Sequence, residues 1–488
     1  MANMQKYLLL TGATGLLGRY LVRDLLVGGR HLALLARSSQ NETAQRRIES
    51  ILSFWETELK RPLPRPVVLE GDICQPDLGL GRSDQKWVEQ HCDEVVHSAA
   101  SLTFHADGSG EPWRSNFGGT ENLLQLMRGT GLRRLHYVST AYVCGLREGR
   151  IMEADLDCGQ AFRNDYEESK LPAEKLVRQA DFLDSLTVYR PAVIAGDSVS
   201  GYTSTYHGIY LYLRLMALLV PRQPLGLDGK RQTPCRVRLH GDETRNVITV
   251  DWVSEVMTHL IMTPSAHGKT FHLAPAQPLT AKELINAGYE FFNSSGIEWV
   301  GDQEIDPATY NSFEAEIIPA MNMYENYQRT DPVFDCTNLL AHAGHIPCPA
   351  ITEEVIHRFI EFGQKDRWGK RRQRSAPADF SMHESLRLIA VDSETFTQNY
   401  RPLVGLDILG PGGGQWTVGV NSTGELASNL GLDFPTPSLI RMAMDDFKNL
   451  IHDLHKSGAF EASNQHVSLD AHGLLDAACI PSLAFLAK

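Results

Sequence analysis

The sequence predicts an α/β protein built on a Rossmann-type, doubly wound parallel sheet, with a smaller substrate-binding subdomain and a C-terminal α+β domain. Three observations support this prediction. A glycine-rich turn joins a short apolar run to an amphipathic helix near the N-terminus. Short apolar runs then alternate with helical patterns, as in a parallel sheet. The chain has 488 residues, which suits two or three domains.

The first strand and helix surround the glycine-rich turn. "KYLLLT" ends at Thr11, "GATGLLG" follows, and a helical pattern then runs to Gly28. The first glycine permits the turn, the second lets the backbone approach a pyrophosphate, and the third allows close packing of helix on strand. A structural glycine turn is the alternative interpretation. We predict a dinucleotide site whose residues here are Thr11, Gly12, Gly15, Leu16, Leu17 and Gly18.

The second strand, "HLALLARSS" (31–39), ends on Arg37 rather than on an acidic residue. An acidic residue there would bind the ribose 2′-hydroxyl of NAD, whereas arginine accommodates the 2′-phosphate of NADP. We therefore expect NADPH rather than NADH, with Arg19 assisting Arg37. Alternatively, Arg37 is only a solvated residue at the end of the strand.

Three further strands complete the predicted βα rhythm. "PVVLEGDI" (66–73) ends in Asp72 and Ile73, where the carboxylate can meet the adenine amine. "DEVVHSAAS" (93–101) has small residues, including Ala99, that would let a cofactor lie against the backbone. A helix (116–127) and a fifth strand (133–145) follow. Ligands bind at the carboxyl ends of such strands.

A catalytic group is predicted from Tyr166 and Lys170 in "NDYEESKLPAEKLV" (164–177). Their spacing of four places both on one helix face. A nearby ammonium stabilises the phenolate and brings the tyrosine into range for proton transfer. Thr140, after the fifth strand, can hydrogen-bond a carbonyl oxygen. The predicted reaction passes hydride from C4 of NADPH to a carbonyl carbon while Tyr166 gives the proton.

These motifs resemble those of a known family. "TGATGLLG", "GDI", "VSTAYV", "YEESK" and "RPAVIAGDS" together are similar to the extended short-chain dehydrogenase/reductases, over about residues 5–365. More narrowly, the chain resembles the thioester reductase domains of carboxylic acid reductases and nonribosomal peptide synthetases, and the fatty acyl-CoA reductases. The resemblance implies that Thr140, Tyr166 and Lys170 are catalytic. It also implies that Lys170 grips the nicotinamide ribose and that Pro191 belongs to the strand closing over the nicotinamide.

Three functions remain open from the sequence. The first is an NADPH-dependent reductase of an acyl thioester, giving an aldehyde or an alcohol. The second is an NAD(P)H-dependent ketone reductase acting on a hydrophobic intermediate of natural-product biosynthesis. The third is a nucleotide-binding regulator without turnover. Nothing in the chain resembles a carrier or adenylating domain, so a thioester would arrive on CoA or on a carrier protein in trans.

A substrate region interrupts the βα rhythm at 197–246. Its apolar helix (208–220) and its tyrosines suggest an oily or aromatic substrate, or simply cap the sheet. Arg231, Arg236 and Arg238 could meet a phosphate or could be a solvated edge. We expect the NADP-binding core at about 5–200 and 246–275, and the substrate part at about 200–245 and 276–365.

The remaining chain divides into a charged linker (366–380) and a C-terminal domain (381–488). We expect strands in 385–396 and 414–426, and an amphipathic helix over 438–458. Their order suggests a lipid-carrier-like fold. A domain that covers the active site or mediates assembly is the alternative.

Composition excludes several partners. The net charge of −13 argues against binding nucleic acid. Eight irregularly spaced cysteines indicate reduced thiols, and there is no signal peptide or transmembrane segment, so we expect a cytoplasmic protein. His342 with His345, and His452 with His455, lack further ligands nearby, so we expect no metal.

Overall fold

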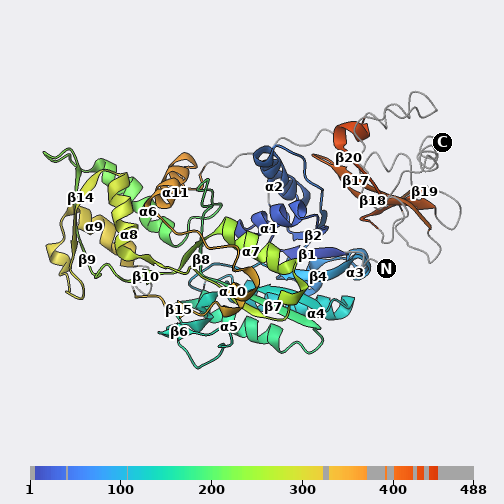
Figure 1. Cartoon of the computed structure of the whole chain (residues 1–488), viewed down its shortest axis with the longest axis horizontal. Helices are drawn as coiled ribbons and strands as arrows, with labels where there is room; N and C mark the ends of the chain where they lie inside the picture. Colours follow the sequence, from blue (N-terminus) through green and yellow to red (C-terminus); the bar gives the residue numbers. More distant parts are fainter. Residues whose placement is uncertain are drawn as a thin grey trace.

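A seven-stranded parallel sheet forms the centre of the molecule (Figure 1), in a computed structural model that describes residues 6–39, 42–106, 108–322, 329–370, 391–392, 401–420, 426–432 and 439–448. The strand order is β12-β7-β5-β4-β1-β2-β3, the doubly wound arrangement. These strands are near-continuous apolar runs because both faces of the sheet are covered. Their bounds are β1 Tyr7–Thr11, β2 Leu32–Ala36, β3 Val67–Glu70, β4 Cys92–His97, β5 Arg134–Val138, β7 Ser185–Pro191 and β12 Thr270–Leu273.

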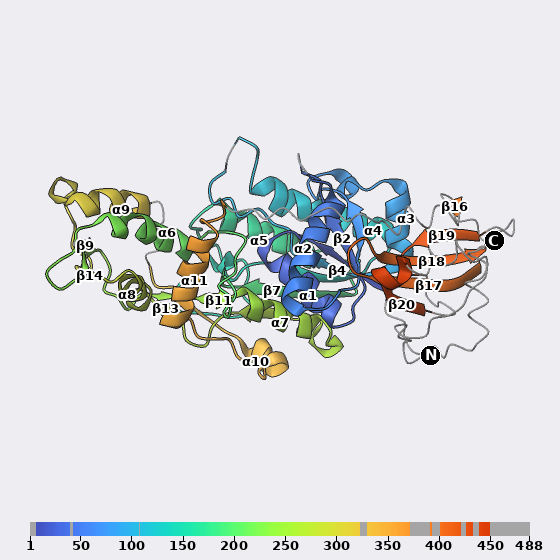
Figure 2. The ribbon, with the colours of Figure 1, turned by 90° about the horizontal axis from the view of Figure 1, so that it is seen from above.

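Helices cover both faces of this sheet and enclose two apolar cores. One face carries α1 (Leu16–Val27), α2 (Ala44–Leu59) and α7 (Val250–Ile261). The other carries α3 (Arg82–His91), α4 (Gly119–Thr130) and α5 (Asp165–Arg178). The predicted Rossmann architecture is therefore confirmed (Figure 2).

A smaller lobe stands at one end of the molecule and has its own apolar core. We call it the small lobe. Its main elements are α6 (Ile209–Leu219), β9 (Arg231–Val237), α8 (Ala281–Phe291), β14 (Ser294–Trp299) and α9 (Ser312–Asn322), with α11 (Glu353–Lys365) packed on α6 and α8. Short strands connect it to the sheet: β8 (Val193–Ala195) pairs with β11 (Val247–Thr249), β10 (Thr244–Arg245) with β13 (Leu279–Thr280), and β6 (Arg150–Ile151) with β15 (Val333–Phe334), beside α10 (Thr337–Ala343).

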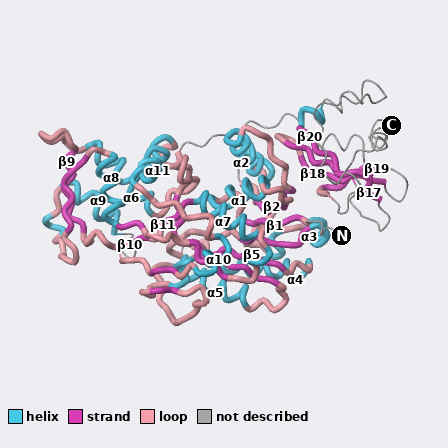
Figure 3. Tube along the Cα trace, viewed as in Figure 1, coloured by secondary structure: helices cyan, strands magenta, loops and turns pink. Residues whose placement is uncertain are grey.

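A second sheet lies at the other end of the molecule (Figure 3). It has the order β16-β19-β18-β17-β20, from Val391–Asp392, Leu426–Leu430, Gly414–Val420, Arg401–Leu409 and Leu439–Ala443 respectively. We call it the C-terminal sheet. It meets the amino ends of the central strands. The Tyr7 hydroxyl donates to Gln415 Oε1 at 2.6 Å, and the Trp87 indole donates to the Leu430 carbonyl at 2.7 Å.

This position bears on one alternative for the C-terminal region. Ligands of a doubly wound sheet bind at the carboxyl ends of its strands. The described part of the C-terminal sheet packs at the opposite, amino ends of the strands, so that part does not cover the predicted active site.

The prediction of a helix over 438–458 is wrong at its start. Leu439–Ala443 forms strand β20, parallel to β17. Ile440 and Met442 point inward, while Arg441 donates to Asp407 of β17 at 2.7 Å. Tertiary pairing thus overrides the helical pattern there. A helical stretch begins only at Met444, and residues 449–458 lie outside the described residues, as do His452 and His455. Among the described helices, none is both long enough and apolar enough to cross a membrane.

Candidate active site

The glycine-rich turn has the tight backbone expected of a dinucleotide site. Gly12 has φ +80°, and a Cβ on it would lie 2.6 Å from the Ala99 nitrogen. A Cβ on Gly18 would lie 2.0 Å from the Gly12 carbonyl oxygen. Gly15 precedes α1 and has no side chain to cap it, so the first N–H groups of α1 face the turn. The residues present therefore fit a pyrophosphate at this helix N-terminus.

Three guanidinium groups gather where the adenosine end of a dinucleotide would lie. Arg37 is 65% exposed and only 3.4 Å from Asp72. Arg47, in the first turns of α2, donates to the Arg37 carbonyl and to Thr14 Oγ1. Arg19 donates to the Thr14 carbonyl. Burial, and then the charges of Arg37 and Arg19, lower the pKa of Arg47. Like charges held this close favour a bound anion.

Sequence reasoning missed Arg47, because it lies ten residues after Arg37 in the next helix. An arginine-rich first turn, "AQRRI", was the available signal.

Thr11 and Ala99 lie behind the turn. Thr11 is fully buried, and its hydroxyl bonds to His97 Nδ1 at 2.7 Å and accepts from the Ala99 nitrogen at 3.3 Å. These contacts fix the loop after β4 against Gly12. Both residues therefore support the backbone of the glycine-rich turn.

The Asp72–Ile73 turn is fastened to α4. Asn122 Nδ2 donates to the Ile73 carbonyl at 2.8 Å, and the Ile73 side chain lies where a Cβ on Gly119 would fall. Asp72 Oδ1 accepts from the Cys74 nitrogen at 3.0 Å. Burial opposes, but the Cys74 and Arg37 contacts prevail and lower the pKa of Asp72, so it is an anion.

Thr140, Tyr166 and Lys170 meet at the carboxyl end of β5. Thr140 begins the short helical turn Ala141–Cys144, and its hydroxyl accepts from the Tyr142 nitrogen. Tyr166 lies in the first turn of α5, with Lys170 one turn later. Burial raises the pKa of Tyr166 to about 12, against the hydrogen bond with Thr140, which lowers it. Tyr166 is therefore protonated at neutral pH and suited to donate a proton.

Lys170 is buried and held by β5. Its Nζ donates to the Val138 carbonyl at 2.9 Å and to the Tyr137 hydroxyl at 3.1 Å. Burial lowers the pKa of Lys170 to about 8, although Glu174 opposes this shift. The ammonium is therefore fixed beside the strand end that carries Thr140.

A buried ion pair between Glu174 and Arg190 lies close to Lys170 and Thr140. Glu174, one turn after Lys170, accepts from Arg190 of β7 at 2.6 Å and from the Ser139 hydroxyl at 2.6 Å. Burial opposes the ionised form, but Arg190 lowers the pKa of Glu174. The pair joins α5 to the end of β5, next to Thr140.

Asn116 is a second residue that sequence reasoning missed. It lies in a π-helical turn (Arg114–Gly118) before α4 and is 1% exposed. Its side chain accepts from the Ser101 nitrogen, and it donates to the Ser101 carbonyl and to the Ser169 hydroxyl of α5. It therefore ties the loop after β4 to α5, the helix that carries Tyr166 and Lys170. The sequence showed it only as the first residue of an expected helix.

One cavity of about 740 Å³ joins Thr140, Tyr166 and Lys170 to the glycine-rich turn. It continues into the small lobe between α6, β9, α8 and α9. Of the predicted site residues, those in its lining are Gly12, Gly15, Leu16, Leu17, Gly18, Thr140, Tyr166, Lys170 and Pro191. Those outside the lining are Thr11, Arg19, Arg37, Asp72, Ile73 and Ala99.

The three arginines of the substrate region have different surroundings. Arg231 donates to the Gln223 carbonyl at 2.7 Å. Arg236 is paired with Glu314 at 2.7 Å. Arg238 is exposed and lines the cavity.

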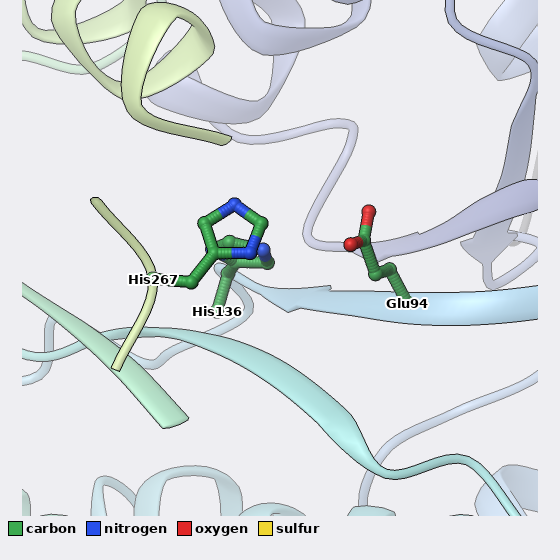
Figure 4. A group of neighbouring side chains, drawn as sticks. All are labelled: Glu94, His136 and His267. Atoms are coloured by element: carbon green, nitrogen blue, oxygen red, sulfur yellow. The ribbon is translucent and has the colours of Figure 1, made fainter. Parts of the chain in front are cut away.

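Two groups of histidines bear on the question of a metal ion. His342 bonds to the Asn338 carbonyl, and His345 packs edge-on against His259. Glu94 of β4, His136 of β5 and His267, in the loop before β12, form a cluster (Figure 4). None of the three lines the cavity. The Glu94 carboxylate already accepts from Arg30 at 2.6 Å and lies 3.1 Å from Arg134. These two cations disfavour a metal ion, and we assign none.

A Rossmann sheet that carries a phenol and an amine one helical turn apart, beside its glycine-rich turn, defines an NAD(P)H-dependent oxidoreductase. The chain belongs to the NAD-binding family described as "Male sterility protein", which matches residues 10–257. This membership confirms the resemblance inferred from the motifs.

Similar proteins include parts of large synthetases. A linear gramicidin synthase polypeptide of Brevibacillus parabrevis is 26% identical over 369 residues, covering 72% of this chain and 7% of that protein. Isonitrile lipopeptide synthase of Mycobacterium tuberculosis is 35% identical over 210 residues, covering 39% and 8%. Aldehyde reductase lnaA of Aspergillus flavus is 25% identical over 395 residues, covering 73% and 36%. The chain thus spans at most 36% of these relatives.

A solved structure agrees with this placement. The terminal R domain from the myxalamid PKS-NRPS biosynthetic pathway is 26% identical, with a TM-score of 0.60, and the match covers 76% of this chain and 94% of that domain.

Proposed function

We propose that this protein is an NADPH-dependent reductase of an acyl thioester and that it yields an aldehyde or an alcohol. The observation that carries the proposal is the shared cavity: Thr140, Tyr166 and Lys170 line the same space as the glycine-rich turn. The thioester is expected on CoA or on a carrier protein in trans. The similarity to a reductase domain of a peptide synthetase pathway supports this substrate class.

The chain's own residues suit the proton chemistry. A reduced nicotinamide supplies hydride when it is bound. Thr140 offers its hydroxyl to a carbonyl oxygen, and Tyr166, protonated at neutral pH, gives that oxygen a proton. The Lys170 ammonium stabilises the resulting phenolate. A hemithioacetal formed from a thioester then expels its thiol to leave an aldehyde.

NADPH preference is proposed from the arginine group. Three positive charges, those of Arg37, Arg47 and Arg19, lie near the end of β2. Arg37 occupies the position where an NAD-binding site has an acidic residue. Arginines bind phosphate groups well because their planar donors match phosphate oxygens. Arg238 remains a candidate for the phosphate of CoA or of a carrier's pantetheine.

A ketone reductase is the second candidate, because the same three residues serve any carbonyl, and because an aldehyde reductase is among the relatives. Incubating the full chain with NADPH and matched panels of acyl-CoAs and ketones distinguishes the two. We expect NADPH oxidation with stoichiometric thiol release from the thioesters. Oxidation with ketones alone would contradict the thioester assignment and favour the second candidate.

A further inference from the structure

A row of polar side chains crosses the central sheet near the carboxyl ends of its strands. Thr11 of β1 is in register with His97 of β4, and His97 is in register with Tyr137 of β5. Residues in register on neighbouring strands point to the same face of a sheet. All three are buried, and α4 and α5 cover this face (Figure 1). The row therefore lies between the glycine-rich turn, which follows Thr11, and the helix that carries Lys170.

Hydrogen bonds join this row to the Lys170 amine. Lys170 Nζ donates to the Tyr137 hydroxyl at 3.1 Å and lies 4.6 Å from the centre of the Tyr137 ring. Tyr137 is also bonded to Thr120 of α4, whose hydroxyl oxygen lies 3.4 Å from His97 Nε2. His97 Nδ1 is 2.7 Å from the Thr11 hydroxyl. The amine and the glycine-rich turn therefore belong to one connected set of hydrogen bonds.

One arrangement of protons satisfies Thr120 and its partners. The Thr120 hydroxyl donates to the Asn116 carbonyl at 2.7 Å, so its oxygen accepts from its other two neighbours. These are the Tyr137 hydroxyl and His97 Nε2. Because the Tyr137 proton points to Thr120, the Tyr137 oxygen is left to accept from Lys170.

His97 completes this arrangement in its neutral form. With Nε2 protonated, its Nδ1 accepts from the Thr11 hydroxyl, whose oxygen accepts from the Ala99 nitrogen at 3.3 Å. Burial, and then the charge of Lys170, lower the pKa of His97 to about 3. The ring is therefore neutral at neutral pH and adds no positive charge beside the amine.

We propose, on the basis of the proposed function, that Tyr137 is a positioning residue that keeps the Lys170 amine charged and fixed at the end of β5. The Val138 carbonyl is the second acceptor of the ammonium, at 2.9 Å. Burial disfavours the charged form of an amine unless its donors have acceptors, so each acceptor counts. Thr120 and His97 act one step further away, because they orient the Tyr137 hydroxyl.

The other titratable groups around Lys170 keep their charge state near neutral pH. On α5, burial raises the pKa of Tyr166 to about 12, and in Glu174 burial is outweighed by an ion pair that lowers the pKa. On β5 and β4, burial raises the pKa of Tyr137, and His97 is neutral. Burial lowers the pKa of Lys170 to about 8, so a pH profile that falls there reports this amine.

The test measures two pH profiles in Tyr137→Phe, which keeps the ring and removes the hydroxyl. One is kcat/KM for NADPH with an acyl-CoA, and the other is the NADPH dissociation constant without substrate, since a charged amine binds hydroxyl groups more strongly. Loss of an acceptor disfavours the ammonium. The fall near pH 8 should therefore move down by about one pH unit in both profiles, the shift for one hydrogen bond to a charge.

Tyr189→Phe is the matched control. Tyr189 lies on the adjacent strand β7, is fully buried like Tyr137, and bonds through its hydroxyl to His136 Nδ1 at 3.0 Å on the opposite face of the sheet. Its hydroxyl should contribute to stability in the same way but leave both pH profiles unmoved. A shift in both folded variants, or in neither, would overturn the assignment.

Thr120→Val tests the support behind Tyr137, and Thr120→Ser keeps the hydroxyl. The valine should move both profiles in the same direction by a smaller step, because the Tyr137 proton then lacks its acceptor. The serine should retain the wild-type profiles. No shift with valine, or an equal shift with serine, would contradict the role given to Thr120.

The two readouts separate this inference from the proposed function. If no thioester is reduced, but the pH profile of NADPH binding moves in Tyr137→Phe, the proposed function is overturned and the role of Tyr137 stands. If thioesters are reduced and both profiles stay in place in the folded variant, the reductase stands and the role of Tyr137 is overturned.

Discussion

The two edges of the central sheet use polar groups in opposite ways. At the carboxyl edge, the α1 N-terminus has no side-chain cap and Arg37 is loosely paired, so donors face the cavity or solvent. At the amino edge, polar groups are paired within the protein: Arg30 forms an ion pair with Glu94, and the Gln415 amide bonds to Tyr7 and Asp407. One edge keeps its donors for a ligand, and the other uses its polar groups to hold a second sheet.

One scaffold thus separates ligand binding from folding stability. Residues at the carboxyl edge should alter catalysis or cofactor choice with little effect on folding. Residues at the amino edge should do the reverse.

The largest expected effect is at Tyr166, the proposed proton donor. Tyr166→Phe should lower kcat by about 10²–10⁴-fold, the range that general acid catalysis supplies. The NADPH dissociation constant, measured by fluorescence titration, should change by less than twofold, roughly the effect of a lost weak contact. Turnover at the wild-type rate would show that another group gives the proton.

A pH effect should follow from Lys170. Burial lowers its folded-state pKa to about 8, below an unfolded value of about 10.4. As pH rises through about 8, the cation is lost, so kcat/KM for NADPH should fall above that pH. Between these two pKa values the unfolded state binds more protons, so this group's contribution to stability rises with pH.

The matched variant for this prediction is Lys170→Arg. It keeps the charge at all accessible pH values, so any remaining activity should lose the falling limb near pH 8. A limb that persists in this variant would belong to a different group.

A smaller effect is expected at Arg47. Arg47→Gln should reduce the preference for NADPH over NADH by about tenfold to a hundredfold, the range for one charged hydrogen bond. The ratio of kcat/KM values for the two cofactors measures it. The neighbouring Arg46, whose backbone nitrogen bonds to Thr43, provides the control variant Arg46→Gln. An unmoved ratio for Arg47→Gln would place 2′-phosphate recognition elsewhere.

The smallest effect on catalysis is expected at the amino edge. Tyr7→Phe removes a hydroxyl that donates to Gln415 and accepts from the Leu432 nitrogen at 3.0 Å. The free energy of unfolding should fall by about 1–3 kcal/mol, the cost of leaving buried partners unpaired. Denaturant titration measures this loss, and kcat should stay at the wild-type value. A parallel loss of kcat would show that the two edges are coupled.

Local patterns explain what the sequence could predict. The strand before Gly12, the turn and α1 are contiguous, so their periodicity predicts both the fold and the glycine contacts. Tyr166 and Lys170 are likewise one turn apart in a single helix. Thr140 follows a strand that the same periodicity defines.

Non-local contacts explain what it could not. Asn116 has its role because the turn before α4 contacts Ser169 of α5. Arg47 has its role because the first turns of α2 lie next to Arg37. Strand β20 forms by parallel pairing with β17, in which Arg441 also donates to Asp407, 34 residues earlier in the chain. The interior of the small lobe combines α6, β9, the segment from α8 to α9, and α11, none of which has a distinctive motif.

The contact between Trp87 and Gly431 has a practical consequence. A Cβ on Gly431 would lie 2.8 Å from the indole, and Tyr7 packs edge-on against the same ring. A chain cut between residues 370 and 401 would uncover this aromatic surface to water. A truncated protein without the C-terminal sheet should thus be less soluble. A fusion protein that contains the reductase should include this sheet.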